Sequence, residues 1–246
     1  MMIRIENMHK NGDLLGNGRR EFLKGVLGAG AFVLGVSGMP EGLFAAGVSG
    51  SAGDPFPPAA EAPLRPGVYL AIDTDGTAYI VAHRSEMGNG VRTSLPRIVA
   101  DELDADWARV KVVQAIGSEE YGDQDTDGSH SVVSFFVPLR EAGATARLML
   151  VRAAAQKWGV PEAECSTELH HVYHKASGKK IGYGELAMAA SKLEVPKKEE
   201  LKLKPRSEWR YIGKSAAGYD LKAMCTGKAK YGQDTRMDGM LYASIA

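Results

Sequence analysis

The residues best suited to chemistry lie in one short stretch, Ser85-Glu86-Met87-Gly88-Asn89-Gly90-Val91-Arg92-Thr93-Ser94. Two glycines bracket one amide side chain there. Glycine reaches positive φ cheaply and has no Cβ, so backbone N–H groups at this turn can approach a ligand closely. A helix that starts near Thr93 would add unpaired N–H donors and the positive end of its dipole. The pattern is typical of a turn that holds a phosphate or pyrophosphate, although it also suits a turn that only reverses the chain.

The elements on either side of this turn must position it. Residues 67–73 and 77–83 have the pattern of strands, and Asp75-Gly76 between them predicts a two-residue hairpin turn. Residues 92–103 carry apolar side chains at helical spacing, and residues 109–115 alternate again as a strand does. We therefore expect the glycine turn to connect a strand directly to a helix.

The rest of the chain continues the alternation of strands and helices. The sequence predicts a loop at 116–131, a helix at 139–158 ended by Gly159, a strand at 166–174, a turn at Ser177-Gly178, a helix at 183–193 and a solvated linker at 197–205. This order favours an α+β fold over strict βαβ alternation.

Composition excludes some classes of function. The 246 residues have room for one or two domains, and 30 basic and 30 acidic residues leave no net charge. Basic residues do not gather with aromatic ones into a stripe, so we expect no nucleic-acid partner. Cys165 and Cys225 fit no zinc or iron–sulfur spacing, so we expect two unrelated thiols and no metal centre, with pairing in an oxidising compartment left open.

The N-terminal region has the pattern of an export address. Arg19-Arg20-Glu21-Phe22-Leu23-Lys24 matches the twin-arginine motif, and residues 26–36 form a short apolar stretch rich in Gly and Ala. That stretch is too short for a comfortable transmembrane helix, which needs about 20 apolar residues. We predict a periplasmic protein exported in the folded state, as suits a protein that acquires a cofactor first. The alternative is a basic cap on an ordinary buried helix.

Several segments carry a more specific pattern. The run His83-Arg84-Ser85-Glu86-Met87-Gly88-Asn89-Gly90-Val91-Arg92-Thr93-Ser94-Leu95-Pro96 continues with Ile98-Val99-Ala100-Asp101-Glu102-Leu103. It is followed by Tyr121-Gly122-Asp123-Gln124-Asp125-Thr126-Asp127-Gly128-Ser129, by Ser177-Gly178 with Tyr183-Gly184-Glu185-Leu186-Ala187, and by Thr226-Gly227-Lys228-Ala229-Lys230-Tyr231-Gly232. In this order the segments closely resemble the molybdopterin-binding subunits of the xanthine dehydrogenase family, in the branch of isoquinoline 1-oxidoreductase beta subunits and periplasmic aldehyde dehydrogenases.

This resemblance implies an oxidoreductase, namely a molybdenum hydroxylase that oxidises N-heterocycles or aldehydes with water as the oxygen source. The implied fold is the N-terminal portion of the molybdopterin-binding large subunit, with helices packed on a mixed sheet. The implied cofactor is molybdopterin with molybdenum, in its cytosine dinucleotide form. The implied partners are a small iron–sulfur subunit, a cytochrome c acceptor and a small-molecule substrate.

The resemblance also assigns residues. It implies that Gly88, Asn89 and Gly90 grip the cofactor where the family has Gly-Gln-Gly, and Asn89 shortens the reach of that amide by about 1.5 Å. A second loop near the cofactor would be formed by Asp125, Thr126, Gly128 and Ser129. The family's catalytic glutamate lies in a Gly-x-Gly-Glu segment near the far end of a longer chain. Gly182-Tyr183-Gly184-Glu185 matches those letters in the family's ordinary helix start, so we assign no catalytic residue and expect Glu185 to serve the helix dipole.

The same reasoning divides the chain into regions. They are a twin-arginine signal region at 1–50, a linker at 51–66, a partial molybdopterin-binding domain at 67–193, a linker at 194–218 and the start of a second, hammerhead-like domain at 219–246. Residues 240–246 have the pattern of a strand that is just beginning, so we expect a fragment that is inactive by itself.

A few residues and functions stay open on the sequence. Glu86 favours a structural hydrogen bond over an acid–base role, and Arg92 suits a cofactor phosphate and a surface salt bridge equally. His170, His171 and His174 are expected as surface residues of a strand rather than metal ligands. Two other functions remain: an exported non-catalytic binding protein that retains the glycine loop, and an exported domain that binds a phosphorylated ligand without molybdenum.

Overall fold

The computed structural model describes Phe56 and residues 62–243. The expected signal region at 1–50, most of the linker expected at 51–66 and residues 244–246 lie outside the described residues. The export motif therefore stays a prediction from the sequence.

The first sheet has four strands in the order β1-β2-β3-β4. These are β1 (Leu64–Gly67), β2 (Leu70–Ile72), β3 (Ala78–Ala82) and β4 (Val110–Gln114). The first three run antiparallel and β4 runs parallel to β3, so the sheet is mixed, as expected. The assignment of residues 64–66 to a linker was wrong. Fully buried Leu64 pairs with Ile72, and an edge strand tolerates Pro66 because its outer N–H needs no partner in the sheet.

The hairpin between β2 and β3 is confirmed, with a longer turn than the sequence predicted. Gly76 donates its N–H to the Asp73 carbonyl oxygen at 3.0 Å, and Asp73 donates to the Thr77 carbonyl oxygen at 2.9 Å. Gly76 has φ of +88°, which places a left-handed residue at the end of a three-residue loop.

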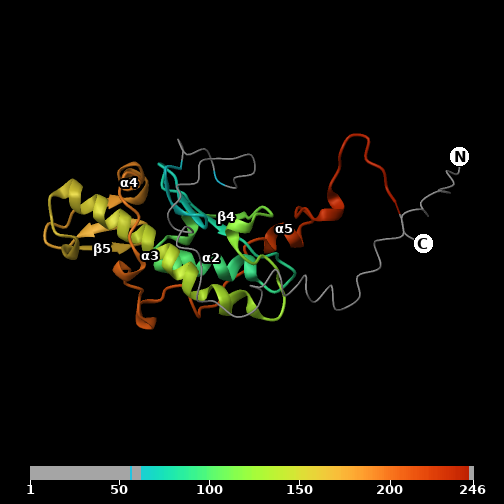
Figure 1. Cartoon of the computed structure of the whole chain (residues 1–246), viewed down its shortest axis with the longest axis horizontal. Coiled ribbons are helices and arrows are strands. Elements are labelled where there is room, and N and C mark those ends of the chain that lie inside the picture. Colours follow the sequence, from blue (N-terminus) through green and yellow to red (C-terminus); the bar gives the residue numbers. More distant parts are fainter. Residues whose placement is uncertain (1–55, 57–61, 244–246) are drawn as a thin grey trace, which may run out of the picture. The chain divides into compact units, whose positions relative to one another are not determined.

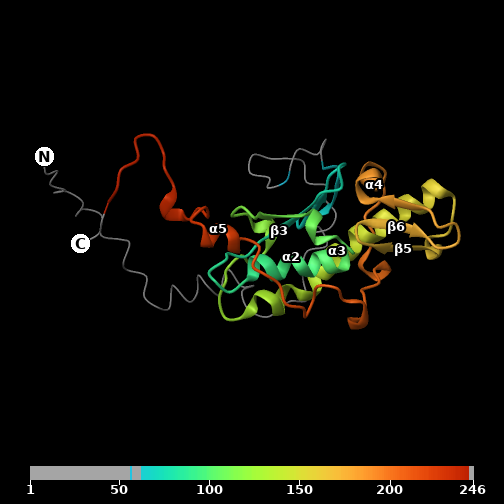
Figure 2. The same ribbon diagram turned by 180° about the vertical axis from the view of Figure 1, so that it is seen from behind.

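Helix α2 (Val91–Glu102) forms the crossover between the parallel strands β3 and β4, and it matches the predicted helix closely. Residues 83–90, which include both glycines of the turn, connect the carboxyl end of β3 to α2 (Figure 2). Leu95 and Val99 on one face of α2 are buried, which fixes the helix on the sheet and thus fixes where the turn can lie.

The longest helix, α3 (His130–Trp158), begins nine residues before the predicted start at 139. The sequence favoured a loop there because Pro138 lacks an N–H and disfavours the helix interior. Buried Phe135 and Leu139 on either side of Pro138 supply the packing that stabilises the helix through this point. The predicted end is confirmed, since Gly159 follows with φ of +68°.

Helices α2 and α3 approach each other closely at Gly143. A Cβ at this position would lie 2.5 Å from the carbonyl oxygen of Val99 and 2.8 Å from the Cβ of Glu102. The missing side chain therefore sets the distance between the two helices. Figure 1 shows α3 continuing past α2 toward the second sheet, and α3 contacts β1, β5 and α4 as well.

The second sheet is an antiparallel set of three strands, β5 (Cys165–Glu168), β6 (His171–His174) and β7 (Lys180–Gly182), followed by α4 (Tyr183–Ala190). The single strand predicted at 166–174 was wrong. Leu169 and His170 have φ of 41° and 67° and form a turn between β5 and β6. Neither residue is typical of such a turn, so the sequence held no indication of it.

The C-terminal part of the chain packs on the body through polar and aromatic contacts. Its short helices are α5 (Leu221–Cys225) and the 3₁₀ turns Lys198–Glu200, Arg206–Glu208 and Gly232–Asp234; further 3₁₀ turns lie at Trp107–Arg109, Glu119–Tyr121 and Glu162–Glu164. The solvated linker expected at 197–205 was wrong at Lys204, which is buried between Asp101 and Asp104. The strand expected from residue 240 is absent over residues 240–243.

Candidate functional site

The two loops singled out in the sequence face each other across one cleft of about 470 Å³. The glycine turn contributes Met87, Gly88 and Asn89 to its wall, and the second loop contributes Thr126, Asp127 and Ser129. The first turns of the two helices that follow these loops complete the wall with Val91, Ser94, Ser131 and Val132. Segments separated by about 40 residues of sequence thus form a single site.

The two loops are connected to each other by side chains. The Thr126 hydroxyl donates to the carbonyl oxygen of Ser85 at 2.7 Å. Behind them, Arg84 Nη2 lies 2.8 Å from Asp123 Oδ2, with the Arg84 side chain fully buried. These contacts fix the width of the cleft, because one loop cannot move without breaking a bond to the other.

The backbone N–H groups of the glycine turn already have a partner within the chain. Glu86 Oε1 accepts the N–H of Gly88 at 2.7 Å and of Gly90 at 2.9 Å, and Oε2 accepts the N–H of Arg92 at 3.1 Å. Burial acts to raise the pKa of the Glu86 carboxyl, but these backbone hydrogen bonds outweigh it and hold the pKa below its usual range. The structural role favoured for Glu86 is confirmed.

The glycines themselves leave the cleft open. Gly88 has φ of +97° and Gly90 has φ of +81°, and a Cβ built on either one would meet no atom within 4 Å. Positive φ explains why glycine stands at both positions. The open space above them would admit a flat ligand close to the backbone.

Among the described residues, no lysine or arginine lines the cleft, and Asp127 adds an acidic side chain. The remaining polar groups are neutral: the Asn89 amide and the hydroxyls of Ser94, Thr126, Ser129 and Ser131. Such a set suits a neutral heterocycle rich in hydrogen-bonding groups better than a phosphate, which favours Arg, Lys or free backbone N–H groups.

His83 and Arg84, which directly precede the glycine turn, are buried against aromatic rings. His83 is buried, with its ring centroid 5.2 Å from that of Tyr69 and 4.2 Å from that of Phe135. Burial, reinforced by the Arg84 guanidinium, lowers the pKa of His83 to about 4. His83 is therefore neutral near pH 7, and the positive charge of this pair is that of Arg84 alone.

Most of the predicted site residues lie at this cleft. Gly88, Asn89, Thr126 and Ser129 line it, whereas Gly90, Asp125 and Gly128 lie in the same two loops without lining it. The sequence reasoning missed Ser131 and Val132, because it placed residue 131 in a loop and began the helix at 139. An earlier helix start would have placed these residues on the first turn beside the second loop.

Three other expectations can be compared with the geometry. Arg92 forms an ion pair with Asp220 at 2.6 Å and donates to Gln114 at 2.8 Å, which is the salt-bridge alternative. Glu185 is exposed and accepts the N–H of Gly182 at 3.2 Å at the start of α4, as expected. Cys165 and Cys225 are unpaired thiols.

The surface location expected for the histidine cluster was wrong for His170 and His174, which are buried. His170 Nδ1 accepts the N–H of Asp106 at 2.6 Å, and His174 lies between Ser177 and Glu164. Within the described residues no group of three or more potential ligands could hold a metal ion. The histidines thus connect elements of the fold.

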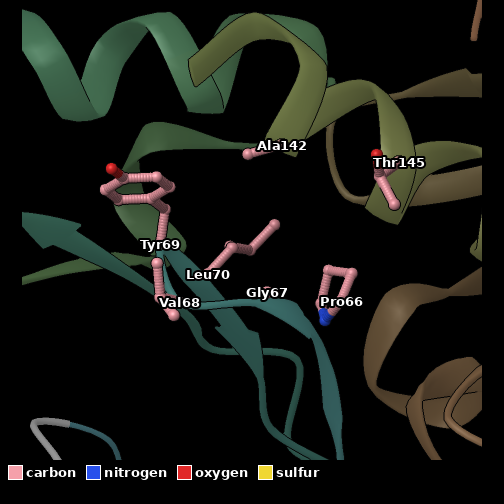
Figure 3. Close-up of a pocket in the computed structure, with 7 residues that line it drawn as sticks. All are labelled: Pro66, Gly67, Val68, Tyr69, Leu70, Ala142 and Thr145. Atoms are coloured by element: carbon pink, nitrogen blue, oxygen red, sulfur yellow. The ribbon is translucent and has the colours of Figure 1, made fainter. Parts of the chain in front are cut away.

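A second cavity is too small for a cofactor. Figure 3 shows the residues that line it, with Ala142 and Thr145 of α3 on one side and Pro66, Val68 and Leu70 on the other. Its volume is about 10 Å³. That volume admits about one water molecule, so it is a packing defect between α3 and the sheet.

Within the described part of the chain, no helix is long and apolar enough to cross a bilayer.

Known proteins resemble this chain over most of its length. The profile of the family described as "Molybdopterin cofactor-binding domain" matches residues 41–228. Isoquinoline 1-oxidoreductase subunit beta of Brevundimonas diminuta is 35% identical over 222 residues, which cover 75% of this chain and 28% of that protein. The membrane-bound aldehyde dehydrogenase (pyrroloquinoline-quinone) of Gluconacetobacter polyoxogenes is 33% identical over 232 residues, which cover 91% of this chain and 28% of that protein.

Among solved structures, the reconstituted CO dehydrogenase from Oligotropha carboxidovorans is 19% identical, with a TM-score of 0.43 over 51% of this chain and 16% of that one. The chain spans 28% of the length of each of the two relatives.

Proposed function

The chain belongs to the molybdopterin cofactor-binding domain family, and on this basis we propose that it forms part of a molybdenum-dependent oxidoreductase that hydroxylates N-heterocycles or aldehydes with oxygen from water. Family membership confirms the resemblance drawn from residues 83–103 and 121–129. Relatives named as an isoquinoline oxidoreductase and an aldehyde dehydrogenase support these two substrate classes.

The observation that carries the proposal is the cleft between the glycine turn and the second loop. Its donors are neutral, the backbone above Gly88 and Gly90 is open, and Asn89 offers both an amide donor and an acceptor. These features fit a molybdopterin ring system. We propose that Asn89, Thr126 and Ser129 contact it while Gly88 and Gly90 allow close approach.

When bound, the cofactor would supply the two-electron acceptor and the site of oxygen transfer. The chain's own residues would bind and orient it. Asn89 would hydrogen-bond its polar edge, and the Thr126–Ser85 hydrogen bond would hold the two walls at the required separation. No described residue is assigned as the base, since Glu185 is engaged at the start of α4.

The rival interpretations are less well supported. A phosphate-binding turn is disfavoured because Glu86 holds its N–H groups and no described basic side chain lines the cleft. Family membership and the named relatives favour an oxidoreductase over a non-catalytic binding protein.

We further propose the finer features that the sequence suggested. The cofactor would take the cytosine dinucleotide form, with its phosphates outside this cleft. One partner would be a small iron–sulfur subunit, because the two cysteines of this chain do not have the spacing of cluster ligands. A cytochrome c would be the electron acceptor. Twin-arginine export would deliver the loaded protein to the periplasm.

Metal and pterin analysis of the folded, full-length protein tests the proposal. About one molybdenum and one pterin per protein are expected, and a protein purified without molybdenum under conditions that load related enzymes would defeat it. Asn89→Ala should lower the retained molybdenum at least about fivefold, the effect of losing one good hydrogen bond. Gln156→Ala, which removes an exposed amide on α3, should leave it unchanged.

A second test uses the sequence of the whole protein. If no second Gly-x-Gly-Glu segment follows downstream of Gly182–Glu185, near the far end of the full-length chain, the hydroxylase mechanism fails even where molybdopterin binds.

A further inference from the structure

The glycine turn has the geometry of an anion nest, with a carboxylate of the chain already inside it. Glu86 accepts hydrogen bonds from Gly88, Gly90 and Arg92 through both of its oxygens, and its side chain is only partly exposed. In contrast, the Asn89 side chain lines the cleft, is exposed, and forms no hydrogen bond with the described residues.

We propose that Glu86 is the positioning residue of this site: its carboxylate fills the nest of backbone N–H groups and so fixes the Asn89 amide as the group that the turn offers to a ligand. This inference deepens the proposed function and rests on it for the identity of the ligand. Its structural part stands on the described contacts alone.

The first argument is competition. A free phosphate could reach these N–H groups only by displacing a carboxylate that is tethered two residues away and so has an effective concentration of at least millimolar order. Like-charge repulsion from Glu86 and Asp127 adds to the cost. The nest is thus closed to anions in the folded protein.

The second argument is conformational. Gly88 and Gly90 both have positive φ. Because glycine is less restricted in φ and ψ than any other residue, the turn would be flexible without further contacts. Hydrogen bonds to a charged acceptor are among the strong ones, and three of them converge on this single side chain. They restrict the turn to one conformation, in which Asn89 faces the second loop.

Amide hydrogen exchange on the cofactor-free, full-length protein tests the structural part. Glu86→Ala should raise the exchange rate of the amides of Gly88, Gly90 and Arg92 about tenfold or more, as expected from the loss of charge-assisted hydrogen bonds. Sodium acetate should restore protection in this variant by refilling the nest, relative to sodium chloride at equal ionic strength. Glu185→Gln is the matched control, since Glu185 also accepts a glycine N–H ahead of a helix.

Inorganic phosphate is the decisive probe of the closed nest. It should leave exchange in the wild-type turn unchanged and should protect the turn in Glu86→Ala. Protection of the wild-type turn by phosphate, or unchanged exchange in Glu86→Ala, would overturn the proposal.

Molybdenum retention tests the functional part. Glu86→Ala should retain at least about fivefold less molybdenum than the wild type, with acetate restoring part of the loss and Glu86→Asp falling between the two. A merely structural role would not respond to acetate or to the length of the carboxylate side chain. Loss of molybdenum in Glu86→Ala without any recovery by acetate or Glu86→Asp would contradict the positioning role.

Two provisions keep the tests separate. If Glu86→Ala does not fold, Glu86→Gln takes its place, because it keeps the size of the side chain and removes the charge. It should also raise the exchange of amides 88–92, and unchanged exchange would overturn the proposal. If the wild-type protein holds no molybdenum, the proposed function fails while the exchange experiments still decide the role of Glu86.

Discussion

The hydroxyl of Thr126 donates a hydrogen bond of 2.7 Å to the carbonyl oxygen of Ser85, across 41 residues of sequence. This bond joins the loop before α3 to the glycine turn before α2. The two loops extend from helices that are themselves in close contact at Gly143, and this bond and the Arg84–Asp123 ion pair connect the loops directly.

Thr126→Val removes this link while keeping the shape of the side chain. We expect the free energy of unfolding to fall by up to about 1 kcal/mol and the cleft loops to become more mobile, because the hydrogen bond between the two loops is lost. Amide exchange of residues 84–90 and molybdenum retention measure the effect. Thr226→Val breaks a hydroxyl-to-carbonyl bond in the exposed helix α5 and should change neither quantity. Equal exchange in the two variants would contradict a role for Thr126 in joining the loops.

Gly143→Ala should destabilise the protein although alanine favours helices. The added Cβ would lie 2.5 Å from the carbonyl oxygen of Val99, which is backbone and cannot move aside easily. Overpacking costs about 1–3 kcal/mol. Replacing glycine by alanine in a helix gains about 1 kcal/mol in helix propensity, so the cost outweighs the gain where the clash is with backbone. Urea unfolding of the full-length protein measures the change.

The control for this substitution is Gly117→Ala, where an added Cβ would meet open space. It should leave stability unchanged or raise it by a few tenths of a kcal/mol. A Gly143→Ala protein as stable as the control would show that α2 and α3 can separate without cost.

Lys204→Met should be among the most destabilising changes outside the cleft. The Lys204 ammonium is buried and lies 2.7 Å from Asp104 and 3.2 Å from Asp101, whose side chain is fully buried. Its loss leaves a buried carboxylate short of a partner, which costs about 3–5 kcal/mol. Thermal unfolding measures it.

Arg210→Met is the comparison for an exposed charge. The Arg210 guanidinium lies 3.4 Å from the Glu168 carboxylate and both side chains are exposed, so its loss should cost less than about 1 kcal/mol. Similar losses of stability in Arg210→Met and Lys204→Met would refute the view that burial decides the strength of the ion pair.

Acid should weaken the fold through two buried histidines. Burial lowers the pKa of both His83 and His170 to about 4, with nearby arginines lowering it further. The unfolded chain therefore binds more protons than the folded one between pH 4 and the ordinary value of 6.5. The two histidines do not lower the free energy of unfolding above about pH 6.5. Between pH 6.5 and about pH 4 each of them lowers it by roughly 3 kcal/mol, and below pH 4 it no longer changes with their protonation.

His83→Phe should remove the contribution of one histidine to this pH dependence. Phenylalanine suits the site because His83 makes no hydrogen bond in the described structure and packs against Tyr69 and Phe135. Urea unfolding at pH 4.5 and pH 7 measures the difference in stability between the two conditions. His130→Phe, at an exposed position, is the control. An unchanged pH dependence in His83→Phe would mean that His83 is not neutral in the folded protein.

Local patterns in the sequence predicted the framework of the site correctly. Strand β3, the glycine turn and α2 follow from alternation, from two glycines and from apolar spacing, all of which act over a few residues. The predictions were wrong where packing between distant segments overrides local preference. Pro138 suggested a helix boundary, yet burial of Phe135 and Leu139 carries α3 through it. Leu169 and His170 are not typical turn residues, and the sequence around them does not predict a turn. His170 is positioned by hydrogen bonds to the backbone of Asp104 and Asp106, which lie about 65 residues earlier in the sequence.

The sequence by itself determined that a strand, a glycine turn and a helix occur in succession, that Glu86 has a structural role, and which family the chain belongs to. Only the tertiary structure decided that the Glu86 carboxylate takes the N–H groups of the turn, so that the Asn89 amide is the polar side chain that the turn offers to the cleft. It also decided that the turn and the loop at 122–129 share one cleft. The reason is physical: φ preferences and apolar periods are properties of neighbouring residues, whereas the partner of a donor depends on which acceptor the folded chain brings within 3 Å.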